Sequence, residues 1–381
     1  MQYLDVSNNS LSGNIPSYIG DMVKLVDLIL GINKCFGPLP LEIGNLVNLV
    51  NLYSPSLLLR GPIPKYICNM RSFQKLDLSN NPLHSPIPNS IGNLQNLTIL
   101  NLVNAEINGS IPVELGNCRN LRTMVLTFNS LTGSLPYTLA DLSLFSFSAE
   151  QNQLIGTLPS WLGRWQKADY ILLASNHFSG HIPPELGNCS SMTHLSLSNN
   201  QLTGYIPPQL CNAKFLSEID LENNMLLGTI ETTFINCKNL TQLILNHNQI
   251  TGRIPGYFGE LHVLLLELDH NNSSGEIPEK IWSSTTLLEF SVAYNFLGGR
   301  LSAEMGKSTT LERLILNDNK LEGEIPKEIG RLSSLSMLSL NGNRLEGRIP
   351  TEFFQCISLA TLDLGKNHLN GTIPKDIGML V

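Results

Sequence analysis

A 24-residue pattern repeats along the whole chain and strongly limits what the chain can fold into. Sixteen copies follow one another at intervals of 24 residues, with two intervals of 23, and fourteen of them hold Asn at the same place. Leu57 and Ala105 stand there in the other two. Gly comes four residues later in fifteen copies, and the unit reads LxxLxLxxNxLxGxIPxxIGxLxx. Because the pattern leaves no residues over, we interpret residues 1–381 as one array of sixteen repeats.

Each part of the unit has a structural reason. The alternation at Leu314, Ile315 and Leu316 predicts a short strand with the two leucines inward and the isoleucine outward. The Asn side chain carries a donor and an acceptor, so a stacked column of Asn can satisfy the buried backbone of successive turns. Leu57 and Ala105 should therefore mark irregular coils. The IGxLxxL segment predicts a short turn of α- or 3-10 helix on the opposite side.

One such coil cannot fold alone, because its few buried aliphatic side chains do not offset the entropy of ordering about 24 residues. Stacked neighbours must supply the rest, so we expect an α/β repeat solenoid of about sixteen 24-residue coils. The first residues already form a repeat and the last stop inside one. We therefore interpret the array as uncapped at both ends, without a signal peptide, a membrane helix or a kinase domain in this chain.

Composition and motifs argue against several functions. With 14% charged residues and a net charge of −7, neither nucleic acid nor an anionic membrane is a natural partner. The segment Gly306–Thr309 matches the last residues of a phosphate-binding loop motif, but the first residue of that motif must be Gly, and Leu301 stands there. His177 and His181 lack the carboxylate that a metalloprotease motif would add. We expect no enzyme activity in this chain, no cofactor and no metal site.

The seven cysteines all occupy consensus positions, and their number is odd. We therefore expect buried free thiols that pack as small hydrophobic side chains. These residues are Cys35, Cys68, Cys118, Cys189, Cys211, Cys237 and Cys356.

Carboxylates gather at the outward positions of the tenth to thirteenth strands, with no Lys or Arg among them. They are Glu218, Asp220, Glu222, Glu267, Asp269 and Glu289, and between them lie Gln242, Ile244 and Asn246. One interpretation is an ordinary water-facing strand surface; the other is a recognition surface for a basic ligand. Tyr170 and Leu172 stand at outward positions of a less acidic stretch and suggest an apolar contact for the ligand.

Two histidines occupy the same place in adjacent repeats. His247 and His270 each stand one residue before the conserved Asn, with Tyr294 next in the column. The register predicts that they lie side by side at one strand spacing. Either they are two ordinary exposed histidines, or their protonation tunes the acidic surface beside them.

The 24-residue unit with GxIPxxIGxLxxL resembles the plant-specific leucine-rich repeat of receptor-like Ser/Thr kinases, over all 381 residues. The departures PSLLLRGPIP (55–64), FSAEQNQLIGTLPSWLGRW (147–165) and LGTIETTF (227–234) are similar to the excess-microsporocytes group of anther receptor kinases. The resemblance implies a right-handed superhelix with its parallel sheet on the concave face and short helical or 3-10 turns on the convex face. It also implies the extracellular part of a plasma-membrane receptor that signals across the membrane.

The implied partners are a small secreted peptide or protein, which is cysteine-rich in the anther group, and a shorter leucine-rich repeat co-receptor kinase. The alternative is a kinase-less receptor-like protein or a soluble inhibitor or defence protein. An extracellular location would make the N-x-S/T sites glycosylation candidates. These are Asn8, Asn96, Asn108, Asn188, Asn239, Asn272 and Asn370. Asn271 also heads such a site but is expected to point inward with the conserved column.

Overall fold

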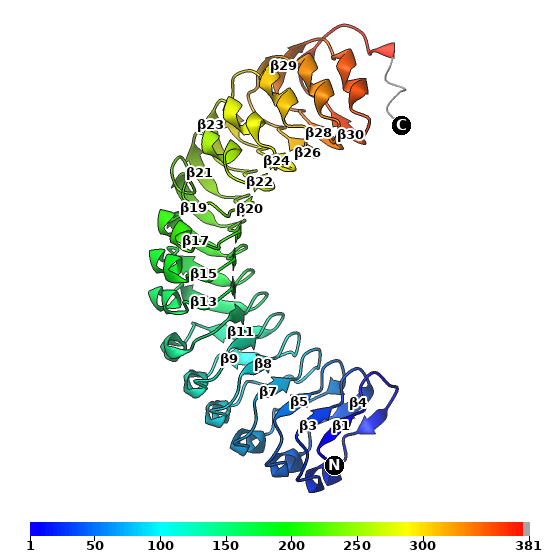
Figure 1. Cartoon of the computed structure of the whole chain (residues 1–381), viewed down its shortest axis with the longest axis vertical. Coiled ribbons are helices and arrows are strands. Elements are labelled where there is room, and N and C mark those ends of the chain that lie inside the picture. Colours follow the sequence, from blue (N-terminus) through cyan, green and yellow to red (C-terminus); the bar gives the residue numbers. More distant parts are fainter. Residues whose placement is uncertain (376–381) are drawn as a thin grey trace. The chain divides into compact units, whose positions relative to one another are not determined.

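The computed structural model describes residues 1–375 and divides into two compact units, which meet in sequence at Asn200 and Gln201. Each unit is a stack of coils, and each coil gives one short strand to a parallel sheet (Figure 1). In the first unit these strands are β1 (Tyr3–Asp5), β3 (Asp27–Ile29), β5 (Asn51–Tyr53), β7 (Lys75–Asp77), β8 (Ile99–Asn101), β10 (Thr123–Val125), β12 (Ser146–Ser148), β14 (Tyr170–Leu172) and β16 (His194–Ser196). In the second they are β18 (Glu218–Asp220), β20 (Gln242–Ile244), β22 (Leu265–Glu267), β24 (Glu289–Ser291), β26 (Arg313–Ile315), β28 (Met337–Ser339) and β30 (Thr361–Asp363).

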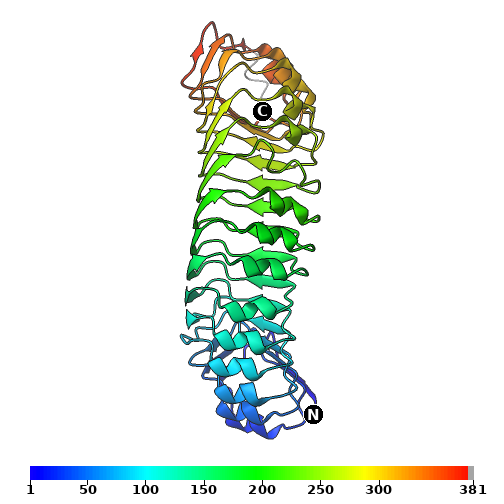
Figure 2. The same ribbon diagram turned by 90° about the vertical axis from the view of Figure 1, so that its left-hand side faces the viewer.

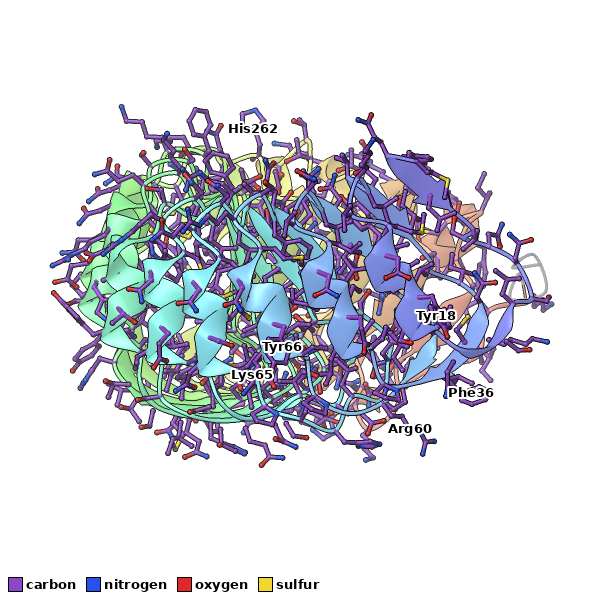
Figure 3. All side chains as sticks on the ribbon, turned by 90° about the horizontal axis from the view of Figure 1, so that it is seen from below. Tyr18, Phe36, Arg60, Lys65, Tyr66 and His262 are labelled. Carbon is purple, nitrogen blue, oxygen red and sulfur yellow. A yellow bond between two sulfur atoms is a disulfide. The ribbon has the colours of Figure 1, made fainter. Side chains whose placement is uncertain are left out.

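Most coils carry a second short strand after the conserved Asn. In the first unit these are β2 (Ser12–Asn14), β4 (Lys34–Gly37), β6 (Leu58–Leu59), β9 (Asn108–Ser110), β11 (Ser130–Gly133), β13 (Gln153–Thr157) and β15 (His177–Gly180). In the second they are β17 (Gln201–Tyr205), β19 (Met225–Thr229), β21 (Gln249–Gly252), β23 (Asn272–Gly275), β25 (Phe296–Leu297), β27 (Glu322–Glu324), β29 (Arg344–Gly347) and β31 (His368–Leu369). Phe36 and Arg60, at the outer side of β4 and just after β6, point away from the ribbon (Figure 3).

A 3-10 turn follows in nearly every coil, and those of the first unit stack into a column (Figure 2). They are η1 (Ser17–Asp21), η2 (Leu41–Asn45), η3 (Lys65–Asn69), η4 (Asn89–Asn93), η5 (Val113–Asn117), η6 (Tyr137–Asp141), η7 (Ser160–Arg164) and η8 (Pro184–Asn188). The second unit has η9 (Pro208–Asn212), η10 (Gly256–Gly259), η11 (Glu279–Ser283), η12 (Ala303–Lys307), η13 (Lys327–Arg331) and η14 (Thr351–Gln355). The fold is thus a solenoid of parallel strands and 3-10 turns, as the repeat predicts.

The core and the Asn column follow the repeat. Leu314 and Leu316 are 0% exposed, and Ile315 between them lies half-buried on the outer face. Asn319 donates from Nδ2 to the carbonyl oxygens of Val292 in the previous coil (2.9 Å) and of Leu316 (3.2 Å). Its Oδ1 accepts from the backbone N–H of Leu297 at 3.0 Å. The predicted role of the Asn, to satisfy the backbone of its own and the adjacent turn, is confirmed.

The coil in which Ala105 replaces this Asn is locally irregular, as expected. The backbone carbonyl of Ala105 takes over part of the missing role, because it accepts from the Leu83 N–H at 3.2 Å. Glu106 beside it adopts a positive φ of 51°. Leu57 is buried, and the strand that follows it, β6, has two residues. Since β25 after Asn295 is equally short, the irregularity expected at Leu57 is not seen in this strand. Within residues 1–375, the coil that holds Ser85 in place of Gly keeps its Asn81 but forms no second strand.

Pro precedes thirteen of the fourteen 3-10 turns in the described part of the chain. At the other one, Ser302 replaces Pro, and its hydroxyl accepts from the Glu304 N–H at 3.2 Å. The coil with Glu231 at this place has neither device, and residues 231–236 form a non-helical turn. This coil is also the one that differs most from the repeat on its turn side.

The expectation of seven free cysteines is wrong for one pair. Cys211 and Cys237 form a disulfide between adjacent coils, with their Cα atoms 4.6 Å apart. Cys211 stands at the Gly place of the IG pair, where a Cβ points closely at the next coil; at Gly330 such a Cβ would lie 2.5 Å from the Glu352 carbonyl oxygen. The thiol therefore reaches into the neighbouring coil, where Cys237 occupies the buried Leu place.

The other five cysteines are free, as predicted. Burial raises the pKa of Cys118 and of Cys189 to about 12. Both thiols donate to a carbonyl oxygen of the previous coil, Cys118 to Ile91 and Cys189 to Leu162. These thiols are protonated at physiological pH and act as core side chains.

Candidate functional site

The predicted acidic residues of the second unit do come together on the outer side of its sheet. Parallel pairing sets Glu218 beside Gln242, Asp220 beside Ile244, and Ile244 beside Glu267. Leu265 of β22 pairs in turn with Glu289 of β24. We use the name acidic face for Glu218, Asp220, Glu222, Gln242, Ile244, Asn246, Glu267, Asp269 and Glu289.

Asp269 is an anchored member of the acidic face rather than an open one. Its carboxylate accepts from the Ser291 hydroxyl at 2.7 Å and from the Ala293 N–H at 2.6 Å. Burial raises the pKa of Asp269, and these two hydrogen bonds oppose that rise. The side chain therefore holds two coils together in addition to any role in binding.

Asn246 links two carboxylate-bearing segments. Its Nδ2 donates to Glu267 Oε2 at 2.6 Å, and its Oδ1 accepts from the Asp269 N–H at 2.7 Å. Only 8% of Asn246 is exposed. The sequence predicted that Asn246 would contact the ligand. In the structure Asn246 is buried, and its amide orients the carboxylate of Glu267.

The absence of cations from this stretch needs a correction at one edge. Arg313 of β26, in the next coil, lies with Nε 3.4 Å from Glu289 Oε1. Burial raises the pKa of Glu289 while the Arg313 charge lowers it. Glu289 is thus an ion-paired boundary of the acidic face, because parallel pairing places each residue beside the same position of the next repeat.

Glu222 lies at the other side of the acidic face, next to Asp220. Asp220 Oδ1 accepts from the Glu222 N–H at 3.1 Å. The pKa of Glu222 is raised by burial and then by the charge of Asp220, whereas His247 lowers it. Both carboxylates are half-buried and face the sheet side.

The predicted histidine pair is confirmed and extends into a stack of three rings. The centroids of His247 and His270 lie 4.1 Å apart with a 12° angle between the rings. Tyr294 stacks on His270 at 4.1 Å and 10°. All three residues have positive φ values of 50–54°, so the same backbone turn in each coil aims the rings in one direction.

Tyr170 and Leu172 lie in the first unit, on β14. Tyr170 is 38% exposed and stacks on His194 of the next strand, with centroids 4.7 Å apart. The sequence analysis missed His194, although it stands at the same repeat position as Tyr170. This aromatic pair is a candidate ligand contact of the first unit.

The seven glycosylation candidates are all exposed. Two of their side-chain amides are engaged: Asn96 Nδ2 donates to the Arg71 carbonyl at 2.8 Å and Asn239 Nδ2 to the Lys214 carbonyl at 2.6 Å. Asn271 is 5% exposed, and its Nδ2 donates to the Leu245 carbonyl at 2.9 Å. Its predicted inward position in the Asn column is confirmed.

Residues 1–375 hold no helical segment with the length and hydrophobicity of a membrane span. Within the same residues, no group of three or more His, Cys, Asp or Glu side chains is arranged to hold a metal ion.

Comparison with known proteins gives one family and several solved structures. The family model described as Leucine Rich Repeat matches residues 1–22, 72–94, 191–213, 239–261, 310–332, 334–356 and 358–380. No curated protein matches the sequence.

The similar structures include plant receptors. A TDR receptor is 32% identical over 100% of this chain and 66% of its own, with a TM-score of 0.95. The plant peptide hormone receptor RGFR1, solved with RGF2, is 33% identical over 97% of this chain and 67% of its own, with a TM-score of 0.80. The Arabidopsis receptor kinase HAESA, solved with the peptide hormone IDA and the co-receptor SERK1, is 33% identical over 100% of this chain and 64% of its own, with a TM-score of 0.94. The chain thus spans 64–67% of the length of these three.

Proposed function

Since the chain belongs to the leucine-rich repeat family, we propose that it is the ligand-recognition part of a plant receptor-like kinase at the extracellular face of the plasma membrane. The observation that carries the proposal is the similarity to hormone-receptor chains along 97–100% of its length. A family-wide solenoid alone would support only the fold, because one fold serves many functions. The Ser/Thr kinase would belong to the full-length protein.

The ligand would be a small secreted peptide or protein with a basic segment, bound on the acidic face. Glu218, Asp220 and Glu222 supply its negative charge at one end, and Glu267 lies two strands further along. A charge cluster of this kind steers a cationic partner and speeds its association. By the pattern of the HAESA complex, which contains a co-receptor, a shorter repeat kinase would join after the ligand.

We further infer that the chain is a member of the excess-microsporocytes group, so that the ligand would also be cysteine-rich. The support is the set of shared departures, of which LGTIETTF at 227–234 is the clearest. This segment covers the end of β19 (Met225–Thr229) and the first part of the non-helical turn at 231–236, which lacks Pro.

The test of ligand recognition is the kinetics of binding to a synthetic lysine-rich peptide, with a glutamate-rich peptide of equal length as the negative probe. Asp220→Asn combined with Glu222→Gln should lower the association rate and its dependence on salt. The matched control is Glu324→Gln combined with Glu346→Gln, two exposed residues on β27 and β29 of the same unit. An equal loss of rate in both double variants would contradict the acidic face as the site.

The receptor part of the proposal has its own test, which is the reading frame downstream of residue 381. A membrane helix followed by protein-kinase motifs supports it. A stop codon after a capping repeat would contradict it and would support a kinase-less protein.

A further inference from the structure

The stack of His247, His270 and Tyr294 stands beside the acidic face and interacts with it electrostatically. His247 and His270 both act on the Asp269 carboxylate, and His247 also acts on Glu222. The two histidines and Tyr294 are exposed. Protons therefore reach the imidazoles directly from solvent, while their charge is felt by two members of the acidic face.

The stacking geometry makes the two imidazoles a coupled pair. With centroids 4.1 Å apart and rings nearly parallel, two imidazolium charges would lie almost as close as two packed atoms allow. Like charges at such a distance repel, so a proton on one ring opposes a proton on the other. The pKa of His270 is lowered by burial and by His247, while Asp269 and Asp318 raise it.

Three carboxylates interact electrostatically with the stack: Glu222 with His247, Asp269 with all three rings, and Asp318 with His270 and Tyr294. From the coil before it comes Glu222, with Asp220 beside it, and from its own coils come Asp269 and Glu267. From the coil after it comes Asp318, whose charge and hydrogen bond raise the pKa of Tyr294. Tyr294 thus stays neutral while the imidazoles titrate, and it serves as a fixed neutral end of the stack.

We propose that this stack is a proton-dependent control of the acidic face, binding protons one at a time as the pH falls and weakening the attraction for a cationic partner with each proton. The proposal rests on the proposed function, because it assigns a regulation to the same surface. The first proton adds a positive charge beside Glu222 and Asp269. The carboxylates act in the same direction, since Glu222, Asp269 and Glu289 have pKa values raised by burial and so lose charge earlier as the pH falls.

The first arm of the test needs no ligand. The C2 proton signals of His247 and His270 are followed by NMR from about pH 4.5 to 8, around the ordinary histidine range, and assigned with His247→Gln and His270→Gln. His247→Gln should make His270 titrate at a higher pH than it does in the wild type, because the charge of His247 lowers the pKa of His270. His262, which points away from the ribbon into solvent (Figure 3), is the internal reference. Unchanged titration of His270 in His247→Gln would overturn the coupling.

The second arm measures binding of the lysine-rich peptide over the same pH range. In the wild type, affinity should fall by about threefold for each proton bound, as expected for one charge added a few ångströms from the partner. His247→Gln combined with His270→Gln should flatten the profile, and His262→Gln should leave it unchanged. Identical profiles for the wild type and the double variant would overturn the proposal. A peptide that binds at no pH would instead refute the basic-ligand function and, with it, this regulatory role, while the NMR arm still decides whether the histidines are coupled.

Discussion

The hydroxyl of Tyr257 donates to the carbonyl oxygen of Ile230 in the previous coil at 2.6 Å. The same hydroxyl accepts from the Phe234 N–H at 3.3 Å. It thereby satisfies two backbone groups of the one turn in the second unit, within residues 201–375, that has neither Pro nor a capping Ser. Burial raises the pKa of Tyr257, so the hydroxyl stays protonated and keeps its donor.

We expect Tyr257→Phe to destabilise the second unit by about 1–3 kcal/mol, because two buried backbone groups lose their partner. The measurement is urea unfolding of the wild type and the variant. Tyr205→Phe is the matched control, since Tyr205 is 68% exposed and should change stability by less than about 0.5 kcal/mol. Equal effects of the two substitutions would show that the hydroxyl does not hold the turn.

The disulfide between Cys211 and Cys237 should stabilise the same region. It closes a sequence separation of 26 residues, for which chain-entropy arguments give roughly 2–4 kcal/mol. We expect reductant to increase hydrogen exchange at residues 230–237 in the wild type and to have no effect in Cys211→Ala combined with Cys237→Ala. Cys189→Ala, which removes a buried free thiol, should keep the response to reductant.

The sequence predicted the repeat geometry closely but not the contacts that break the repeat. The register of His247 and His270 follows from the period alone, since parallel stacking sets equal positions side by side. The repeat period did not predict the disulfide, because Cys211 and Cys237 occupy different consensus places, Gly and Leu, rather than the same place in adjacent repeats. A Cys where a Cβ points at the next coil was the available signal.

The acidic face shows a second reason for incomplete prediction. Outward position along a strand is a property of the backbone, and the repeat period predicts it correctly for Glu267 on β22, whereas Asn246, which was also expected to face outward, is buried. Which carboxylate is open and which is engaged depends on side-chain rotamers and on neighbours in the next coil. The hydrogen bond from Ser291 to Asp269 does not follow from the period. The Glu289–Arg313 pair does, because the two residues stand 24 apart at the same repeat position.

A pair of adjacent asparagines allows a direct test of the Asn column. Asn271 Oδ1 accepts from the Ile250 N–H at 2.9 Å, and its Nδ2 donates to carbonyl oxygens of its own and the previous coil. Asn272 next to it is exposed. We expect Asn271→Ala to cost about 1–3 kcal/mol of unfolding free energy, because the buried backbone loses its partners.

Asn272→Ala should stay within about 0.5 kcal/mol of the wild type. Both variants replace an Asn by Ala at adjacent positions. Thermal or urea unfolding therefore distinguishes the stabilising effect of the Asn column from the effect of losing any Asn side chain. A cost shared equally by the two would count against the column as a stabilising element.

Asp269 gives the stability of the second unit a defined dependence on pH. Burial raises its pKa in the folded state, so the folded chain binds this proton more readily than the unfolded chain does. The contribution of the group is therefore fully present below the unfolded pKa and is lost as the pH rises through the folded pKa.

Asp269→Asn keeps an oxygen that accepts from Ser291 and Ala293, and its amide does not titrate. The difference in unfolding free energy between Asp269→Asn and the wild type should accordingly grow in favour of the variant between about pH 4 and 7, around and above the ordinary Asp range. Asp269→Ala should be less stable than both at every pH, because the Ala293 N–H and the Ser291 hydroxyl lose their acceptor. Urea unfolding of the three proteins at several pH values measures these differences. A difference between Asp269→Asn and the wild type that does not change with pH would refute the raised pKa, and an Asp269→Ala variant as stable as Asp269→Asn would refute the anchoring role.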